Sequence, residues 1–393
     1  MLREKHGIIR DDYILLAVVL LLTMLGLVIL YSASYLFAMN QPWRFSNARA
    51  PLTGNFAACL IMVVLFPVLM ILIKIEWLNN GKVIFGIITV TAILNMLPFF
   101  PYFQRALHDP GTDVMRWIVL KVGDKELVTF QPSELIKITL PLYLAYILDK
   151  NSERLDSFVY GPLPPVVVTA GFCTIVLLQS NFSDAVLIAF ISLVICFAAG
   201  IRLRWFVLTI ALVIPAAFML INSNARWSQR IDNFINKAEI VSSGRTQIDF
   251  SLEAVKSGGF WGKGFGHGTL KTRMPEVHGD FVFASFAEES GFLGVLGYLF
   301  LIGFFGFLGY VTAWRSKDRF AQLLAFGLVT PIIVQTLLNI AVVAGIIPVT
   351  GVPLPFVSSG GSSMLITLIS AALIVNITRR NAILDDMGVH RVR

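Results

Sequence analysis

The chain has 393 residues, of which 56% are hydrophobic and only 14% are charged, and its formal net charge is +7 at pH 7. A soluble domain carries about 25% charged residues, so this composition excludes a protein that lies mostly in water and favours one embedded in lipid. The positive charge does not indicate a nucleic-acid partner, because the excess Lys and Arg lie mainly in connections that are expected to face the cytoplasm.

Apolar runs along the chain predict ten membrane spans, at about 20 residues for each crossing. They are expected near 13–38, 55–74, 83–101, 133–148, 162–179, 183–200, 205–221, 284–314, 320–347 and 361–377, and the eighth is expected to begin with an amphipathic lead-in. The first is not a secretory signal, because its run from Ile14 to Leu30 is longer than a signal core of about 7–15 residues. The predicted fold class is an all-α integral membrane protein with one polytopic domain, 1–393.

The distribution of Lys and Arg predicts that both termini lie in the cytoplasm. About half of the 31 Lys and Arg residues fall in the termini and the inner connections, whereas the outer connections after the fifth and ninth spans carry none. The long outer loop 222–283, between the seventh and eighth spans, is largely exempt from this rule. Two outer segments are therefore large enough to hold a site, 102–132 and 222–283.

The sequence does not predict a bound metal or a disulfide framework. Cys59, Cys173 and Cys196 all fall within apolar spans, where they are expected to be small core residues. None of the five histidines has a metal-ligand spacing such as His-Glu-x-x-His.

The first outer loop, 102–132, contains Arg116, followed by an apolar run from Trp117 to Leu120 that is expected to lie in the membrane interface. The fourth span then begins with Glu134 and Lys137, whose spacing of three places both side chains on one helix face. An ionisable residue at this depth needs a partner. Lys137 is thus either half of a structural ion pair, or a snorkelling lysine, or a cation that meets an anionic substrate group at the outer face.

The stretch from Leu252 to Gly291 is polar and glycine-rich within an otherwise lipid-soluble sequence. Its alternating glycines, Gly262 to Gly268, do not form a dinucleotide-binding motif, because no βαβ unit surrounds them. They predict either a mobile loop or a backbone surface that lies close to a ligand. Lys263 falls among them and is a candidate substrate-binding residue.

Asp280 is the candidate catalytic residue of this stretch. A carboxylate at the edge of a membrane cavity suits a general base, because desolvation raises its pKa. The alternative is that Asp280 caps the following helix, and spacing alone does not separate the two. Glu276 and His278, close before it, are candidate substrate-binding residues.

The tenth span is expected to open from the outside with Ser358, Gly360, Gly361 and Ser362. Free backbone N–H groups at a helix N-terminus make an anion site, especially where glycines allow close approach. Capping by serine explains the same residues.

Together these motifs resemble the SEDS family (shape, elongation, division and sporulation) over Asp12 to Arg380. The residues that carry the resemblance are Tyr31-Ser32-Ala33-Ser34, Arg116-Trp117-Ile118, Gln131-Pro132-Ser133-Glu134 with Lys137, Ser257-Gly258-Gly259 through Gly264, Pro275-Glu276 with His278, Asp280-Phe281, Glu288-Glu289, Leu354-Pro355-Phe356 and Gly360-Gly361-Ser362-Ser363. Any one motif is weak, but their order and spacing are specific. The ending Asn376 to Arg380 favours the division-type branch over the elongation-type branch.

The resemblance implies a bacterial inner-membrane glycosyltransferase that polymerises lipid II into glycan strands at the extracytoplasmic face. It implies ten helices with both ends cytoplasmic, Asp280 as the catalytic carboxylate, and Glu134, Lys137 and Arg116 as parts of the outer cavity. It also implies a class B penicillin-binding protein and divisome proteins as partners. No cofactor is required by these residues, although a divalent cation can assist at a pyrophosphate.

The chain departs from the family pattern in three places. Where the family usually has Gln-Pro-Asp-Leu-Gly-Thr, this chain has Gln179-Ser180-Asn181-Phe182-Ser183-Asp184, so the expected aspartate is missing and Asp184 is its nearest replacement. Gly279 stands in place of threonine and Ser359 in place of tyrosine. Two rival functions remain open, a flippase or transporter of lipid II and a noncatalytic scaffold for wall synthases.

Overall fold

The computed structural model describes residues 11–40, 66, 75–100, 116–122, 125–209, 211, 228, 234, 247–269, 281–357 and 361–387. Its helices are α1 (Asp11–Asn40), α3 (Ile75–Leu78), α4 (Gly81–Met96), α5 (Ser133–Lys150), α6 (Leu163–Leu178), α7 (Phe182–Ala198), α11 (Gln247–Gly258), α12 (Val282–Arg315), α13 (Arg319–Val343) and α14 (Gly361–Asp386). Two strands, β1 (Ile118–Val122) and β2 (Lys125–Phe130), and short 3₁₀ turns at Leu97–Phe99 and Ser152–Arg154 complete the described elements.

Helices occupy the predicted spans wherever the structure describes them. Five are long and apolar enough to cross a membrane: Asp11–Ser32, Gly81–Phe99, Val282–Arg315, Arg319–Val343 and Gly361–Asp386. The helices α6 and α7 are apolar but shorter. The predicted spans 55–74 and 205–221 lie mostly outside the described residues. The chain is therefore a helical, multi-pass membrane protein, and the total of ten spans remains a prediction.

The fold is helical as predicted, and the first outer loop adds one hairpin that the sequence analysis did not predict. β1 and β2 pair in an antiparallel hairpin, with Ile118 opposite Phe130 and Leu120 opposite Val128. The cause is local: β-branched and apolar residues lie on both sides of Gly123-Asp124, a residue pair that favours a tight turn. Of the apolar run Trp117–Leu120, the residues from Ile118 onward belong to the first strand, and the location of this run in the membrane interface stays a prediction.

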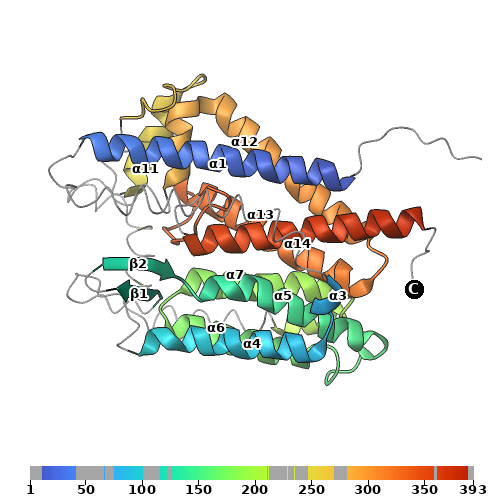
Figure 1. Cartoon of the computed structure of the whole chain (residues 1–393). Helices are drawn as coiled ribbons and strands as arrows, with labels where there is room; N and C mark the ends of the chain where they lie inside the picture. The colour runs from blue at the N-terminus through green and yellow to red at the C-terminus, as the bar shows by residue number, and fades with distance from the viewer. Residues whose placement is uncertain are drawn as a thin grey trace, which may run out of the picture.

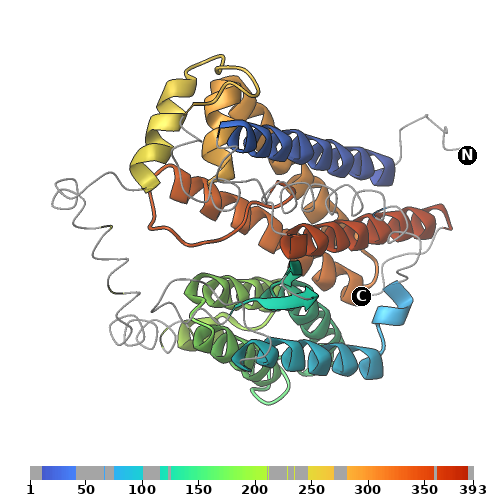
Figure 2. The same ribbon diagram turned by 60° about the vertical axis from the view of Figure 1, so that its left-hand side comes forward.

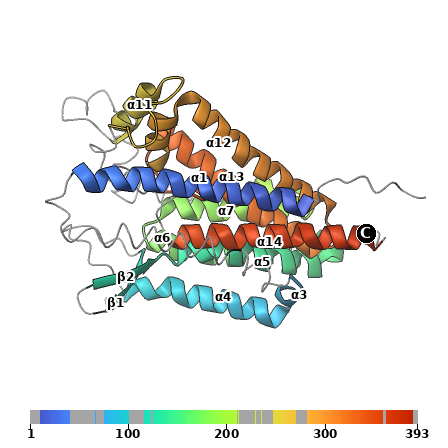
Figure 3. The ribbon, with the colours of Figure 1, turned by 45° about the horizontal axis from the view of Figure 1, so that its top comes forward.

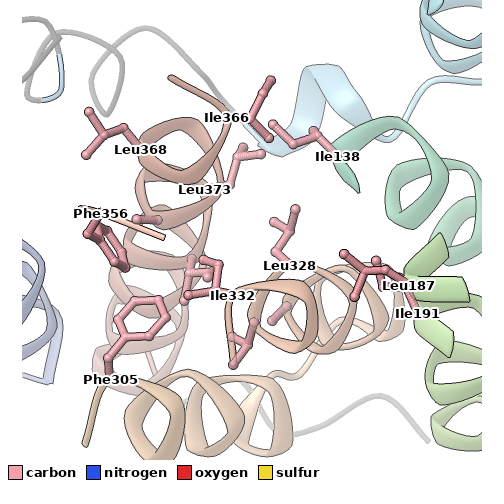
Figure 4. Packing of buried hydrophobic residues seen from close by; sticks show 14 of the residues in the cluster. Ile138, Leu187, Ile191, Phe305, Leu328, Ile332, Phe356, Ile366, Leu368 and Leu373 are labelled. Carbon is pink, nitrogen blue, oxygen red and sulfur yellow. The ribbon is translucent and has the colours of Figure 1, made fainter. Parts of the chain in front are cut away.

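Most of the helices run along one common direction, whereas α11 and α12 are inclined to it, and α13 and α14 lie between two groups (Figures 1 and 2). The helices α1, α11 and α12 lie on one side and α4, α5, α6 and α7 on the other. The central helix α13 packs against α5, α7, α12 and α14. Figure 4 shows the apolar contacts at this centre, where the rings of Phe305 and Phe356 meet edge to face with centroids 5.6 Å apart.

One end of the bundle collects the elements that carry the candidate residues. The hairpin, α11 and the first turns of α5, α7, α12 and α14 all lie at this end, which we call the loop end (Figures 1 and 3). The start of α1 and the end of α14 lie at the opposite end (Figure 3). The two ends of the described chain thus lie on one side, as the predicted topology requires.

Candidate functional site

Three buried charged side chains meet where α5 contacts α7, at the loop end. Lys137 Nζ lies 2.5 Å from Glu134 Oε1 and 3.6 Å from Asp184 Oδ1. None of the three residues is more than 3% exposed. Burial of a lone charge is strongly unfavourable, so each of these groups depends on the others for compensation. The Glu134–Lys137 pairing expected from their spacing is confirmed, and Asp184 joins it from a different helix.

The second oxygen of Asp184 is held by three polar side chains. Its Oδ2 accepts hydrogen bonds from Asn181 Nδ2 at 2.5 Å, Ser133 Oγ at 2.9 Å and Gln131 Nε2 at 3.2 Å. Asn181 is also the N-cap of α7, because its side-chain oxygen accepts from the backbone N–H of Asp184. The aspartate is therefore fixed, with Oδ1 directed toward Lys137.

The start of α14 packs against this cluster. The backbone N–H of Gln131, whose side chain also holds Asp184, donates to Ser362 Oγ at 3.4 Å. Ser362 is only 4% exposed. The helix terminus that the sequence predicts as an anion site, with Gly361 as the first residue of α14, therefore contacts the cluster through Gln131.

Arg116 lies at the turn that connects α6 and α7. Its Nη2 donates to the backbone oxygen of Ser180, the residue before Asn181. Ser180 has a φ of 60°, a left-handed conformation that is uncommon for a serine. Arg116 is thus next to the turn that positions Asp184, and its place in an outer cavity stays a prediction.

A second buried cluster joins the glycine-rich loop to α12. Lys263 Nζ lies 2.7 Å from Glu288 Oε1, and this oxygen also accepts from the backbone N–H of Thr269 at 3.0 Å. Glu289 accepts from Ser32 of α1 at 2.6 Å and from the backbone N–H of Gly266 at 3.2 Å. Lys263 is therefore placed as the partner of a fully buried glutamate, away from the Lys137 pair.

The same loop fills a break in α12. The helix is interrupted at Gly291 (φ 64°, ψ −166°), and its flanking N–H groups at Phe292 and Leu293 donate to the backbone oxygens of Gly259 and Phe260. In return, Lys263 N–H and Gly264 N–H donate to the backbone oxygens of Glu288 and Glu289. The described part of the glycine-rich loop is thus hydrogen-bonded to α12 through its backbone.

Several candidate residues lie outside the described residues: Glu276, His278, Asp280, Ser358 and Gly360. The described part of α12 begins after its N-cap residue Phe281, whose side chain makes no capping hydrogen bond. The choice between a base and a helix cap for Asp280 therefore lies outside the described residues. Phe281 is 1% exposed, which places Asp280 directly before a buried residue.

The structure adds functional candidates that the sequence analysis did not assign. Asp184 was identified only as a replacement in an altered motif, and its contact with Lys137 depends on the packing of α5 against α7. Ser133 and Asn181 were motif positions without a predicted partner. Among the described residues, no group of three or more His, Cys, Asp and Glu side chains gathers to hold a metal.

The Lys137 cluster can bind an anion. A lysine ammonium has three hydrogens, and Lys137 donates one of them to Glu134, whereas Asp184 Oδ1, at 3.6 Å, is an ion-pair partner beyond hydrogen-bond distance. A ligand oxygen can accept from a remaining hydrogen, and the low dielectric of the site strengthens such a bond. The arrangement therefore suits the stabilisation of negative charge that develops on a departing group.

Comparison with known proteins gives consistent matches over almost the whole chain. The model of a family described as cell cycle protein, FtsW/RodA/SpoVE, matches residues 12–383. A protein of Borreliella burgdorferi named probable peptidoglycan glycosyltransferase FtsW is 32% identical over 94% of this chain and 97% of its own length. The relative of that name from Bacillus subtilis is 32% identical over 93% of this chain and 90% of its own length.

Two solved structures share the fold. A chain from a peptidoglycan synthase complex that coordinates polymerization and crosslinking superposes with a TM-score of 0.71, at 24% identity, over 94% of this chain and 98% of that chain. The rod shape determining protein RodA of Thermus thermophilus superposes with a TM-score of 0.64, at 23% identity, over 93% of this chain and 96% of that chain.

Proposed function

We infer that this chain polymerises lipid II into peptidoglycan glycan strands, because it belongs to the FtsW/RodA/SpoVE family of cell cycle proteins. It is a peptidoglycan glycosyltransferase of cell division, because relatives that are 30–32% identical over most of the chain carry that name. The residue roles, the face of the membrane and the partners given below are proposals.

The proposed reaction is a single displacement. The 4-hydroxyl of the acceptor sugar attacks the anomeric carbon of the growing chain, the bond from that carbon to the pyrophosphate oxygen breaks, and undecaprenyl pyrophosphate leaves. Asp280 takes the proton of the attacking hydroxyl. One displacement inverts the configuration at the anomeric carbon, as in inverting glycosidases.

Lys137 is proposed to hold the leaving pyrophosphate, with Arg116 and the Gly361 end of α14 as additional donors. The observation that carries this assignment is the buried ammonium between Glu134 and Asp184, beside the first turn of α14. The charge on the leaving oxygen grows as the bond breaks, so a preorganised cation there lowers the barrier. Glu134 orients the lysine.

The rival function is transport of lipid II across the membrane without a covalent change. A transporter needs a site that opens to both faces, usually near the middle of the bilayer. The Lys137 cluster, the hairpin and the loop packed on α12 gather at one end of the bundle (Figure 1). This arrangement favours an enzyme whose site opens to one face, which we propose is the extracytoplasmic face of the inner membrane.

A class B penicillin-binding protein is the proposed partner, together with other divisome proteins. The structural neighbour from a synthase complex that coordinates polymerization and crosslinking supports a partner of this kind. Crosslinking needs a strand to crosslink, so pairing the two enzymes in one complex supplies each nascent strand to the transpeptidase.

The test is polymerisation of purified lipid II by the purified protein in detergent, alone and with the transpeptidase. Glycan strands resolved on a gel would support the enzyme. In parallel, a liposome assay measures transfer of fluorescent lipid II between leaflets. Transfer without glycan product would support the transporter, and neither activity would support the scaffold. Addition of EDTA to the first assay tests whether a divalent cation assists.

A further inference from the structure

The carboxylate at position 184 is an unusual feature of the Lys137 cluster. Asp184 lies one helical turn after Asn181 at the start of α7, and the two side chains touch, with Asn181 Nδ2 2.5 Å from Asp184 Oδ2. The chain has an amide at the first position and an acid at the second, where the motif of the resembling family has an acid and a threonine. The acid has thus moved by one turn.

The charge of the cluster limits how many acids it can hold. With all three groups ionised, Glu134 and Asp184 contribute two negative charges and Lys137 one positive charge. A further carboxylate at 181 would lie at hydrogen-bond distance from Asp184 and would repel both that acid and an anionic substrate. Removal of the acid at 184 would leave Lys137 tied to Glu134 alone.

We propose that Asp184 is a positioning residue that sets the direction of the Lys137 ammonium, and that a single carboxylate on the first turn of α7, at 184 or at 181, performs this role. Three donors from Gln131, Ser133 and Asn181 hold its second oxygen, so its first oxygen is aimed at Lys137. The ammonium donates to Glu134 on α5 and is attracted to Asp184 on α7 at 3.6 Å, so the two acids together set its position. This inference rests on the proposed function, in which the ammonium meets the leaving pyrophosphate.

The exchange is suggested by the direct contact between the side chains of Asn181 and Asp184 at the start of α7. Side chains three residues apart on a helix are neighbours. In the exchanged variant, an Asp at 181 would take the place of the amide that now touches Asp184, and an Asn at 184 would supply the amide. The wild type and the exchange variant differ only in which of the two positions carries the carboxylate, so the composition and volume of the cluster stay the same.

The experiment is a double-mutant cycle in the full-length protein, with Asp184→Asn, Asn181→Asp and the exchange Asn181→Asp/Asp184→Asn. Purified variants are assayed for kcat and KM with lipid II, and their unfolding midpoints are measured in detergent. Asp184→Asn is expected to lower kcat by about 10- to 100-fold. Its KM should not rise, because the cluster becomes one charge more positive toward an anionic substrate.

Asn181→Asp is expected to raise KM, since it adds a negative charge. The exchange variant is expected to recover most of the kcat that Asp184→Asn loses. The matched control is Asp156→Asn, which removes an acid from an exposed ion pair with Arg202 and should leave both constants unchanged.

The proposal is overturned if folded Asp184→Asn keeps the wild-type kcat, or if the folded exchange variant is no more active than Asp184→Asn. A purely structural role would lower the unfolding midpoint and the active fraction of Asp184→Asn, while kcat per folded molecule and KM stayed at the wild-type values. If the wild-type protein itself makes no glycan, the proposed function fails. In that case the unfolding midpoints still test the exchange, which predicts that the double variant is more stable than either single variant.

Discussion

Lys137 is the residue whose chemical identity matters most in the described site. Its ammonium is in contact with two carboxylates within a space that is almost closed to water. A compact ammonium fits between them as a point charge, whereas a guanidinium is planar, larger and suited to a two-pronged contact.

We therefore expect Lys137→Arg to recover little of the activity that Lys137→Ala loses, with kcat/KM for lipid II down by about 10²-fold or more in both. Glu134→Ala should lower kcat less than Lys137→Ala does. It should lower the unfolding midpoint more, because it removes the closest partner of a buried cation. Wild-type kcat/KM in Lys137→Arg would show that only the charge at this position matters.

Lys263 and Glu288 form an ion pair whose two partners differ in exposure. The lysine side chain is 32% exposed and the glutamate 0%. Lys263→Met should lower the free energy of unfolding by about 1–3 kcal/mol, because it removes the charged donor of a buried carboxylate. Thermal unfolding in detergent measures the change, with Lys256→Met, on the exposed side of α11, as control. Equal midpoints for the two variants would contradict the assigned role.

For single residues, the sequence predicts side-chain contacts within one helix and misses contacts between segments that are far apart in the chain. The Glu134–Lys137 pair follows from a spacing of three on one helix, which any helix satisfies. The Asp184 and Ser32 contacts join segments far apart in the sequence, and they exist only because α5 packs on α7 and α1 on α12. No single-sequence pattern contains that information.

The break in α12 is the element that depends most on one residue type. Gly291 has a φ of 64°, and a Cβ added there would lie 2.2 Å from the backbone nitrogen of Gly262. A side chain is therefore disfavoured both by the backbone conformation and by the loop that fills the break.

Gly291→Ala should reduce the yield of folded protein and lower its unfolding midpoint, by about 2 kcal/mol or more in free energy. Gly297→Ala, in the regular part of the same helix, adds a Cβ that meets no atom within 4 Å. This control should be neutral or stabilising by up to about 1 kcal/mol. Equal losses in both variants would show that the break itself does not require glycine. Size-exclusion profiles in detergent and thermal unfolding supply the readout.

The elements themselves were partly predictable from the sequence. Long apolar runs predict the helices because each crossing needs a fixed length of chain. The sequence analysis missed the hairpin β1–β2, although the turn signal Gly123-Asp124 is visible. It interpreted the apolar run Trp117–Leu120 only as an interface segment and did not consider a strand there. The break at Gly291 was not predictable, since a glycine in an apolar helix is common and only the loop packed into it shows its role.

For the whole molecule, the account requires the loop end to face outward. In a variant without the native cysteines, single cysteines at 263 and 271 should react with a membrane-impermeant maleimide added to intact cells. Cysteines at 154 and 317 should react only after the membrane is permeabilised, because they lie in predicted inner connections rich in Lys and Arg. Labelling of 154 in intact cells would invert the orientation.

The central claim is that this chain forms the glycosidic bond with Asp280 as the base, and comparison of wild type with Asp280→Asn in a lipid II polymerisation assay tests it most directly. Both proteins are purified in the same detergent, checked for equal unfolding midpoints, and incubated with lipid II together with the transpeptidase. We expect glycan strands from the wild type and none above background from Asp280→Asn, because an amide cannot accept the proton of the attacking hydroxyl. Equal glycan product from the two folded proteins would contradict the account.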